Sequence, residues 1–179
     1  MNVYTGTSSR TAIYLYKSNN TIIEENSITS VYYTHVFLEG ANHNRIRDNL
    51  FISNTRWGQA LLLRKSHNNL IEWNKVYGTS EINEGGIGAI HSTKNVIQFN
   101  DIKQNDWCGI SLYGSNGTVI RGNNITDHRI LFGIYLERSE NSTIYCNNFV
   151  NNVKDVEAYK AKNTTWSFEG LGNYWDKYR

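Results

Sequence analysis

The sequence contains no proline, only two cysteines and a single methionine among its 179 residues. Proline cannot donate a ladder hydrogen bond, so its absence leaves strands free to pair along their whole length. Cys108 and Cys146 lie far apart without CxxC spacing, which indicates neither a disulfide framework nor a zinc site. The net charge of +2 does not point to nucleic acid or to an anionic membrane as a partner.

Long apolar segments are also missing. No apolar run approaches the roughly 18 residues of a transmembrane helix, so membrane insertion is not expected. The opening residues, MNVYTGTSSRTAIYLYK, lack the basic-then-apolar order of a signal peptide. This suits either a cytosolic protein or a mature segment, and the length suits one domain.

What the chain does contain is a repeat. The pattern I-x-x-N-x-I, with Val or Phe replacing the last Ile in places, occurs six times at steps of 23 to 26 residues. Apolar residues, or Ala in one turn, stand eleven and thirteen positions before each asparagine, and Ser or Ala stands eight before it. The six asparagines are Asn26, Asn49, Asn74, Asn100, Asn123 and Asn147.

Each repeat therefore contains three short segments of alternating apolar residues joined by polar corners, which predicts one turn of a coil rather than a hairpin. A leucine-rich repeat would show a helical half, and none is present. Asn tolerates the left-handed conformation of a tight corner, and its amide can bond the same amide in the next turn. We predict an all-β solenoid of about six turns over residues 1–152, with an inward Asn ladder and a capping tail over residues 153–179.

Two lines of the sequence, GISLYGSNGTVIRGNNI and GIYLERSENSTIYCNNF, resemble the repeat of the NosD-like family of right-handed parallel β-helix proteins. The closing GLGNYWDKY is similar to the ending of such repeats in archaeal surface proteins. The resemblance implies a right-handed, single-stranded parallel β-helix. It also places the chain in a wider clan of carbohydrate-binding proteins and sugar hydrolases, among them pectate-lyase-like enzymes.

In the pectate-lyase-like relatives the resemblance implies a substrate groove on the first strand of each turn and the loop before it. The outward residues of that strand carry no charge here, which favours glycan binding over catalysis. They are Tyr14, Phe37, Leu62, Gly88, Ser111 and Tyr135. Tyr33, Trp57 and Trp107 on the preceding loops, with Tyr14 and Tyr135, are the predicted carbohydrate-binding residues, because aromatic faces suit sugar rings. The alternative is that these rings only pack over neighbouring loops.

The competing hypothesis is a polysaccharide lyase, epimerase or glycoside hydrolase whose acids come from the loops. Candidate catalytic residues are Glu81, Glu84, Asp106 and Asp127. A lyase would use Ca²⁺ bound by such acids; otherwise no cofactor is expected. A copper-site accessory role is less favoured, because His35, His43, His67, His91 and His128 fall in different columns and no metal site is predicted.

The residues at the two ends of the repeat indicate how the ends of the coil are covered. Asn2 and Tyr4 match the Asn-x-Ile of an earlier turn, and an open coil end exposes strand edges. We therefore expect either continuation in a longer chain or end-to-end self-association. The tail aromatics Trp166, Phe168, Tyr174, Trp175 and Tyr178 serve as a cap or, alternatively, as a sugar-binding patch. The sequence predicts an extracellular or cell-surface module that binds a glycan or acts as a scaffold, without its own catalysis.

Overall fold

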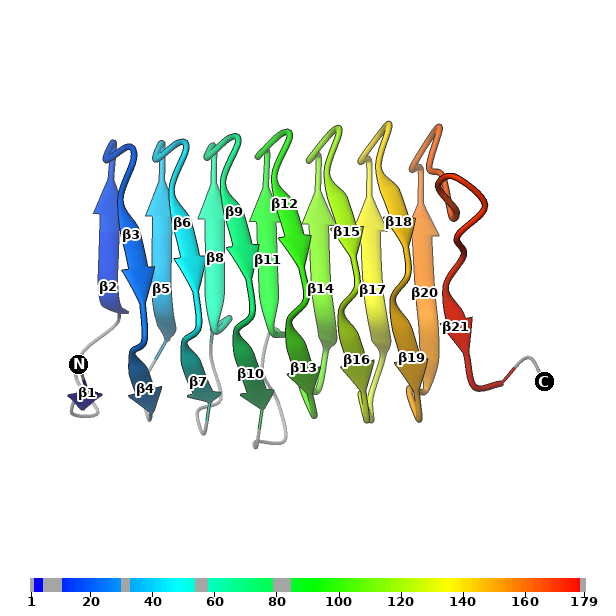
Figure 1. Ribbon diagram of the computed structural model, residues 1–179, viewed down its shortest axis with the longest axis horizontal. Coiled ribbons are helices and arrows are strands. Elements are labelled where there is room, and N and C mark those ends of the chain that lie inside the picture. Colours follow the sequence, from blue (N-terminus) through cyan, green and yellow to red (C-terminus); the bar gives the residue numbers. More distant parts are fainter. Residues whose placement is uncertain (1, 5–10, 30–32, 54–57, 79–84, 178–179) are drawn as a thin grey trace.

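The protein is a stack of similar turns, each contributing one strand to each of three parallel sheets (Figure 1). The computed structural model describes residues 2–4, 11–29, 33–53, 58–78 and 85–177. No helix occurs within those ranges, and no helix there could span a membrane. The parallel β-helix predicted from the repeat is confirmed.

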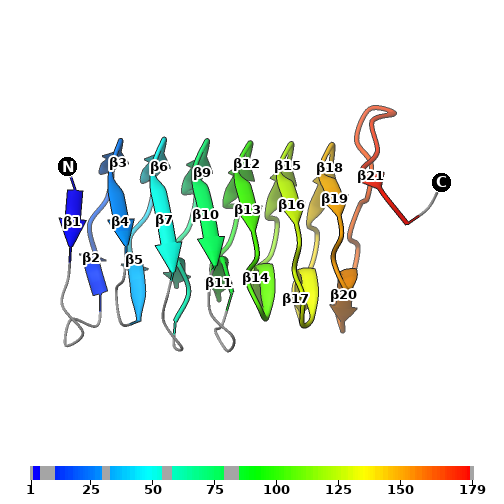
Figure 2. The same cartoon turned by 90° about the horizontal axis from the view of Figure 1, so that it is seen from below.

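Within a turn the chain passes from sheet B to sheet C and then to sheet A. Sheet B consists of β2 (Thr11–Tyr16), β5 (Thr34–Glu39), β8 (Leu61–Arg64), β11 (Ile87–Ile90), β14 (Cys108–Tyr113), β17 (Phe132–Glu137) and β20 (Lys154–Tyr159). Sheet C consists of β3 (Ile22–Glu24), β6 (Arg45–Arg47), β9 (Leu70–Glu72), β12 (Val96–Gln98), β15 (Val119–Arg121) and β18 (Thr143–Tyr145). Sheet A consists of β1 (Asn2–Tyr4), β4 (Ser27–Thr29), β7 (Leu50–Ser53), β10 (Lys75–Gly78), β13 (Asp101–Lys103), β16 (Asn124–Thr126), β19 (Asn148–Val150) and β21 (Tyr174–Trp175). Figure 2 shows the turns following one another along a single axis.

The core is the set of apolar columns read from the sequence. In sheet B, for example, Leu61 pairs in register with Ile87, which pairs with Ile110. All three side chains are buried, at no more than 1% exposure. Because each turn places an aliphatic residue over the one before, the columns merge into one continuous apolar cylinder.

The predicted Asn ladder runs through the corner between sheets C and A. The backbone N–H of Asn74 donates to Oδ1 of Asn100 at 2.9 Å, and its side-chain amide donates to the same oxygen at 3.0 Å. The amide also donates to the carbonyl of Ile46 in the preceding turn at 2.9 Å. Each buried amide thus satisfies corner groups that no sheet hydrogen bond reaches.

Two further ladders occupy the other corners. Asn44, Asn69 and Asn95 repeat the same bonding between sheets B and C. Between sheets A and B, the N–H of Asn105 donates to Nδ1 of His128 at 3.2 Å, and the N–H of His128 donates to Oδ1 of Asn152 at 3.2 Å. His128 therefore takes the place of an asparagine in a buried corner.

Features of the repeat continue beyond residue 152, where the predicted repeats end. β20 pairs with β17, and Asn173 accepts from the N–H of Asn147 at 3.0 Å as the next rung of the Asn ladder. Trp175 stacks on Phe149, with ring centroids 4.5 Å apart and planes 6° apart. The tail is thus a partial seventh turn that covers the end of the core, beside a hollow of about 690 Å³.

The first strand differs by one position from the sequence-based alignment. Val3, rather than Tyr4, is opposite Ile28, and Asn2 is opposite Ser27. The match of Asn2 and Tyr4 to the Asn-x-Ile of an earlier turn is therefore wrong, because two matching letters were too few to fix the register.

Candidate functional site

The outward face of sheet B is the candidate site. Its central column is the predicted series extended by one turn, because Glu157 of β20 pairs with Tyr135. Glu157 forms an ion pair with Lys154. The column runs Tyr14, Phe37, Leu62, Gly88, Ser111, Tyr135 and Glu157.

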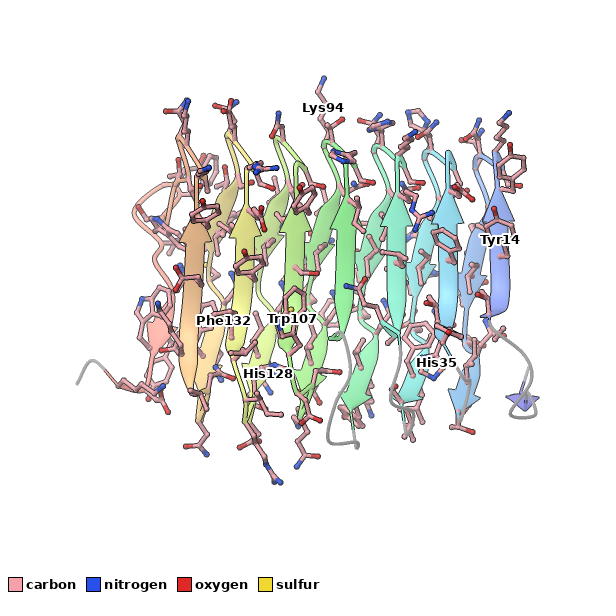
Figure 3. All side chains as sticks on the ribbon, turned by 180° about the vertical axis from the view of Figure 1, so that it is seen from behind. Tyr14, His35, Lys94, Trp107, His128 and Phe132 are labelled. Carbon is pink, nitrogen blue, oxygen red and sulfur yellow. The ribbon has the colours of Figure 1, made fainter. Side chains whose placement is uncertain are left out.

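Aromatic rings gather at both ends of this face, and Figure 3 shows Tyr14 near one end and Trp107 and Phe132 towards the other. Tyr14 stacks on Phe37, with centroids 5.2 Å apart and planes 22° apart. At the other end Tyr135 lies 5.6 Å from Trp107 and 5.5 Å from Phe132. Tyr14 is 50% exposed and Trp107 is 37% exposed, so both clusters present rings to solvent.

Small residues occupy the middle of the face. Gly88 and Ser111 replace the aromatic residues of the outer turns, and the side chain of Gln59 lies over Gly88. Its amide donates to the hydroxyl of Ser111 at 3.2 Å. The two aromatic clusters, Phe37 to Tyr135, are four turns or roughly 19 Å apart along the axis. The face is thus a shallow strip with an aromatic platform near each end.

The phenols on this face keep their protons. The hydroxyl of Tyr14 donates to Glu39, and this hydrogen bond raises the pKa of Tyr14 above its usual value. Partial burial, together with a hydrogen bond to Glu137 at 2.9 Å, raises the pKa of Tyr135. Both side chains are neutral hydrogen-bonding groups near neutral pH, not bases.

The predicted sugar-binding residues are only partly brought together. Trp107 and Tyr135 are in contact, and Tyr14 lies at the opposite end of the strip. Tyr33 is 39% exposed on the loop before β5, and Trp57 lies outside the described residues. Phe132 and Gln59 also belong to this face and are not among the residues predicted from the sequence. The LFG segment carries a signal for Phe132, since an aromatic residue there directly precedes the Gly-Ile pair that recurs at the start of this strand in several turns.

The predicted catalytic acids do not share one position in the coil. Asp127 occupies the corner directly after β16 and accepts a hydrogen bond from Asn151 at 3.4 Å. Asp106 stands two residues past the equivalent corner residue, Gln104, whose N–H donates to Thr126. Glu81 and Glu84 lie outside the described residues. The enzymatic hypothesis and its Ca²⁺ stay predictions.

Taken together, three parallel sheets and stacked Asn corners define a β-solenoid protein of the parallel β-helix class. The chain belongs to the family described as "Periplasmic copper-binding protein (NosD)", which matches residues 2–179. The predicted NosD-like resemblance is confirmed. Among curated proteins, none matches the sequence.

Several solved structures share the fold. A mutant of the periplasmic alginate epimerase AlgG superimposes with a TM-score of 0.73 at 15% identity, over 88% of this chain and 47% of that one. The A-module of mannuronan C-5 epimerase AlgE6 from Azotobacter vinelandii gives 0.65 at 16% identity, over 89% and 55%. The enzymatically active domain of bacteriophage CBA120 tailspike protein 2 gives 0.60 at 17% identity, over 76% and 22%. The chain spans about half the length of the two epimerase structures and less than a quarter of the tailspike domain. At identities of 15–17% the likeness shows the fold alone.

The family description raises the question of copper, which prefers thiolate, thioether and imidazole ligands that converge on one point. No three His, Cys, Asp or Glu side chains form such a group in the described part of the chain. Burial lowers the pKa of both His35 and His128 to about 4; His35 bonds the carbonyl of Ile52, and His128 bonds the backbone of Asn105 in a different turn. His67 instead bonds Thr93 at 2.9 Å. The described residues do not fit a copper site.

Proposed function

We propose that the chain binds a glycan along the outward face of sheet B and performs no catalysis there. The observation that carries the proposal is the pair of exposed aromatic clusters, Tyr14 with Phe37 and Trp107 with Phe132 and Tyr135. Aromatic faces pack against the apolar faces of sugar rings, and polar groups between them fix orientation. Gln59 and Ser111 supply such polar groups between the two clusters.

Binding without catalysis is supported by the chemistry of the strip. An epimerase or lyase needs a base beside a carboxylate, and a hydrolase needs two carboxyl groups flanking the scissile bond. The only carboxylate in the central column, Glu157, pairs with Lys154 at the last turn. The phenols of Tyr14 and Tyr135 remain protonated.

We also propose that the protein works outside the cytoplasm. The family is described as periplasmic, and the alginate epimerase AlgG that shares the fold is described in the same way. A glycan-binding role suits an extracellular or cell-surface module. If no glycan binds, a scaffold role would be left as the simpler function.

The test is affinity electrophoresis through gels containing neutral, uronate-rich or sulfated polysaccharides. We expect retardation in at least one gel, without shortening of the polymer. Trp107→Ala should weaken binding about tenfold, or ~1.4 kcal/mol, because it removes one platform. Trp73→Ala is the control: it removes an even more exposed tryptophan, 56% against 37%, at a corner away from sheet B. Free migration in every gel, or equal effects of both variants, would contradict the proposal.

The second candidate is a polysaccharide epimerase, lyase or hydrolase, favoured by the epimerases and tailspike that share the fold. Loss of polymer around the retarded band, a new unsaturated product or a changed uronate composition would establish it. The first variants to make would then be Asp106→Asn and Asp127→Asn.

A further inference from the structure

One corner of the coil carries positive charge in a single line. It is the corner that follows sheet B, where the chain turns toward sheet C. Five of its seven positions hold basic residues and the other two hold glycine. We call the five basic residues the basic ridge: Lys17, Lys65, His91, Arg138 and Lys160.

The corner residues are stacked in register. The N–H of Lys17 donates to Glu39 at 2.9 Å, and that of Lys65 donates to Ile90 at 3.0 Å, each reaching the strand end of the next turn. The same bond recurs at Arg138, which donates to Tyr159 at 3.0 Å. Since adjacent turns are about 4.8 Å apart, the ridge spans roughly 29 Å with one basic residue every one or two turns.

The glycines in the line make room for their neighbours. A Cβ at Gly114 would stand 2.7 Å from Nδ1 of His91, so the imidazole lies over that glycine. A Cβ at Gly40 would stand 3.6 Å from Cγ of Lys17. The basic side chains therefore extend along the ridge, over the turns that lack one.

The choice of residue at this corner is not explained by backbone geometry. Lys17, Lys65 and Arg138 have φ of 50°, 49° and 48°, a region that favours Gly and Asn and disfavours long side chains. The corner before the Asn ladder has the same conformation but shares no residue type with the corner after sheet B other than glycine: it carries Glu25, Asp48, Trp73, Phe99, Gly122 and Cys146. Solubility alone could be provided by acidic or basic residues. The corner that follows sheet B carries basic residues and glycine, and no acidic residue.

Most of the positive charge on the ridge is not neutralised. Within the described ranges, Lys17, Lys65 and Lys160 form no ion pair, and Lys17 and Lys160 lie about 5 Å from the rings of Tyr16 and Tyr159. Of the adjacent acids, Glu39 is engaged by Tyr14 and Arg64, which lie outside the ridge, whereas Glu137 bonds Tyr135 and also pairs with Arg138 of the ridge. Arg138 has Glu137 at 3.9 Å and donates to the Tyr113 hydroxyl at 3.0 Å.

We propose that the basic ridge binds the acidic groups of a linear, carboxylate-bearing polysaccharide lying along the solenoid axis. This rests on the proposed function and narrows it from any glycan to an acidic one, because the ridge borders the outward face of sheet B. Duplex DNA fits less well, since it carries one charge per about 1.7 Å and calls for a dense basic patch. A polymer with one charge per sugar matches a sparse row of basic residues separated by glycines.

The test compares polygalacturonate with its fully methyl-esterified form, two polymers with the same backbone and different charge. The ridge variant is Lys17→Gln/Lys65→Gln. The control, Lys75→Gln/Lys103→Gln, loses the same charge from sheet A. We expect the intact protein to bind polygalacturonate more tightly, with an affinity that falls as salt rises. The ridge variant should lose roughly 2- to 30-fold in affinity for polygalacturonate, and the control should not.

The outcomes separate the two proposals. Equal binding of both polymers, reduced by Trp107→Ala but unchanged in the ridge variant, overturns the ridge and leaves the aromatic strip in place. Salt-sensitive binding of polygalacturonate that the ridge variant loses and Trp107→Ala keeps overturns the strip. Tighter binding of duplex DNA or anionic vesicles than of polygalacturonate, lost in the ridge variant, overturns the assignment to a polysaccharide. No binding of any polymer overturns both proposals.

Discussion

Gln59 and Ser111, 52 positions apart in the chain, are joined by a hydrogen bond of 3.2 Å that crosses the turn between them. The turn that is crossed contributes only Gly88 at this position, so the Gln59 amide has room to lie flat on sheet B. The floor of the proposed glycan strip is therefore set by three residues from three successive turns.

A double-mutant cycle tests this arrangement. A methyl group at Gly88 would overlap the Gln59 amide, so Gly88→Ala should expel that side chain and lower the free energy of unfolding by about 1 kcal/mol. In a Gln59→Ala background the same change should be neutral or stabilising by about 0.4–1 kcal/mol, because alanine restricts the unfolded chain. Urea unfolding of the four proteins gives the coupling. The same effect in both backgrounds would show that Gln59 does not lie over Gly88.

The Asn ladder gives a second prediction. Asn74→Ala removes the acceptor of the Asn49 N–H and the donor to the Ile46 carbonyl, leaving buried groups unsatisfied. We expect a loss of roughly 2–5 kcal/mol in the free energy of unfolding. Asn26→Ala, at a half-buried rung that starts the series, should lose about 1 kcal/mol or less. Chemical denaturation measures both, and similar losses would argue against a ladder that depends on burial.

The buried imidazole at a ladder position gives a pH prediction. The pKa of His128 is about 4 in the folded protein, lowered mainly by burial, against about 6.5 when unfolded. The unfolded state thus takes up a proton first, so stability is complete above pH ~6.5 and falls as pH drops toward ~4. His35 contributes in the same direction.

His128→Asn is the matched variant, because Asn105 and Asn152 occupy the same position in the adjacent turns. It should flatten the dependence of unfolding free energy on pH between those limits by up to about 1.4 kcal/mol per pH unit. Unfolding curves across this range decide it. An unchanged slope would show that His128 does not titrate with unfolding.

Thiol labelling gives a fourth prediction. Cys146 is exposed at a corner, whereas Cys108 is fully buried and its pKa is raised by burial to about 12. A thiol reagent should modify one equivalent quickly in the folded protein and the second only on unfolding. Cys146→Ser should abolish the fast phase. Two fast equivalents would mean that β14 opens readily.

The columns of the coil could be predicted from the sequence because parallel, in-register stacking places equivalent residues over one another. Ile97, for instance, must offer Ile71 and Ile120 the same shape. Gln59 could not be predicted in this way, since it comes from a loop outside the columns. Asn173 follows Asn147 at a step of 26 residues that the repeat already uses, but the motif around it is lost, because Gly170 and Trp175 replace the apolar residues on either side.

In the candidate site, too, residues in the repeat columns could be predicted and contacts made outside them could not. The outward column from Tyr14 to Tyr135 was predictable because it is part of the repeat, and its residues are where the register places them. Contacts between columns, such as Phe132 with Tyr135, depend on side-chain directions that the repeat does not specify. The grouping of the acids remains a prediction for the same reason.

The Asn ladder also has a direction. Every rung donates to the oxygen of the rung that follows it in the chain, from Asn26 through Asn147 to Asn173. All hydrogen bonds of the ladder therefore point the same way along the solenoid axis. Each turn presents a donor on one side and an acceptor on the other. Removing one whole interior turn would bring a matching donor and acceptor together, whereas reversing a turn would oppose two donors. Proteins built in this way can lengthen or shorten by complete turns without redesigning the joints.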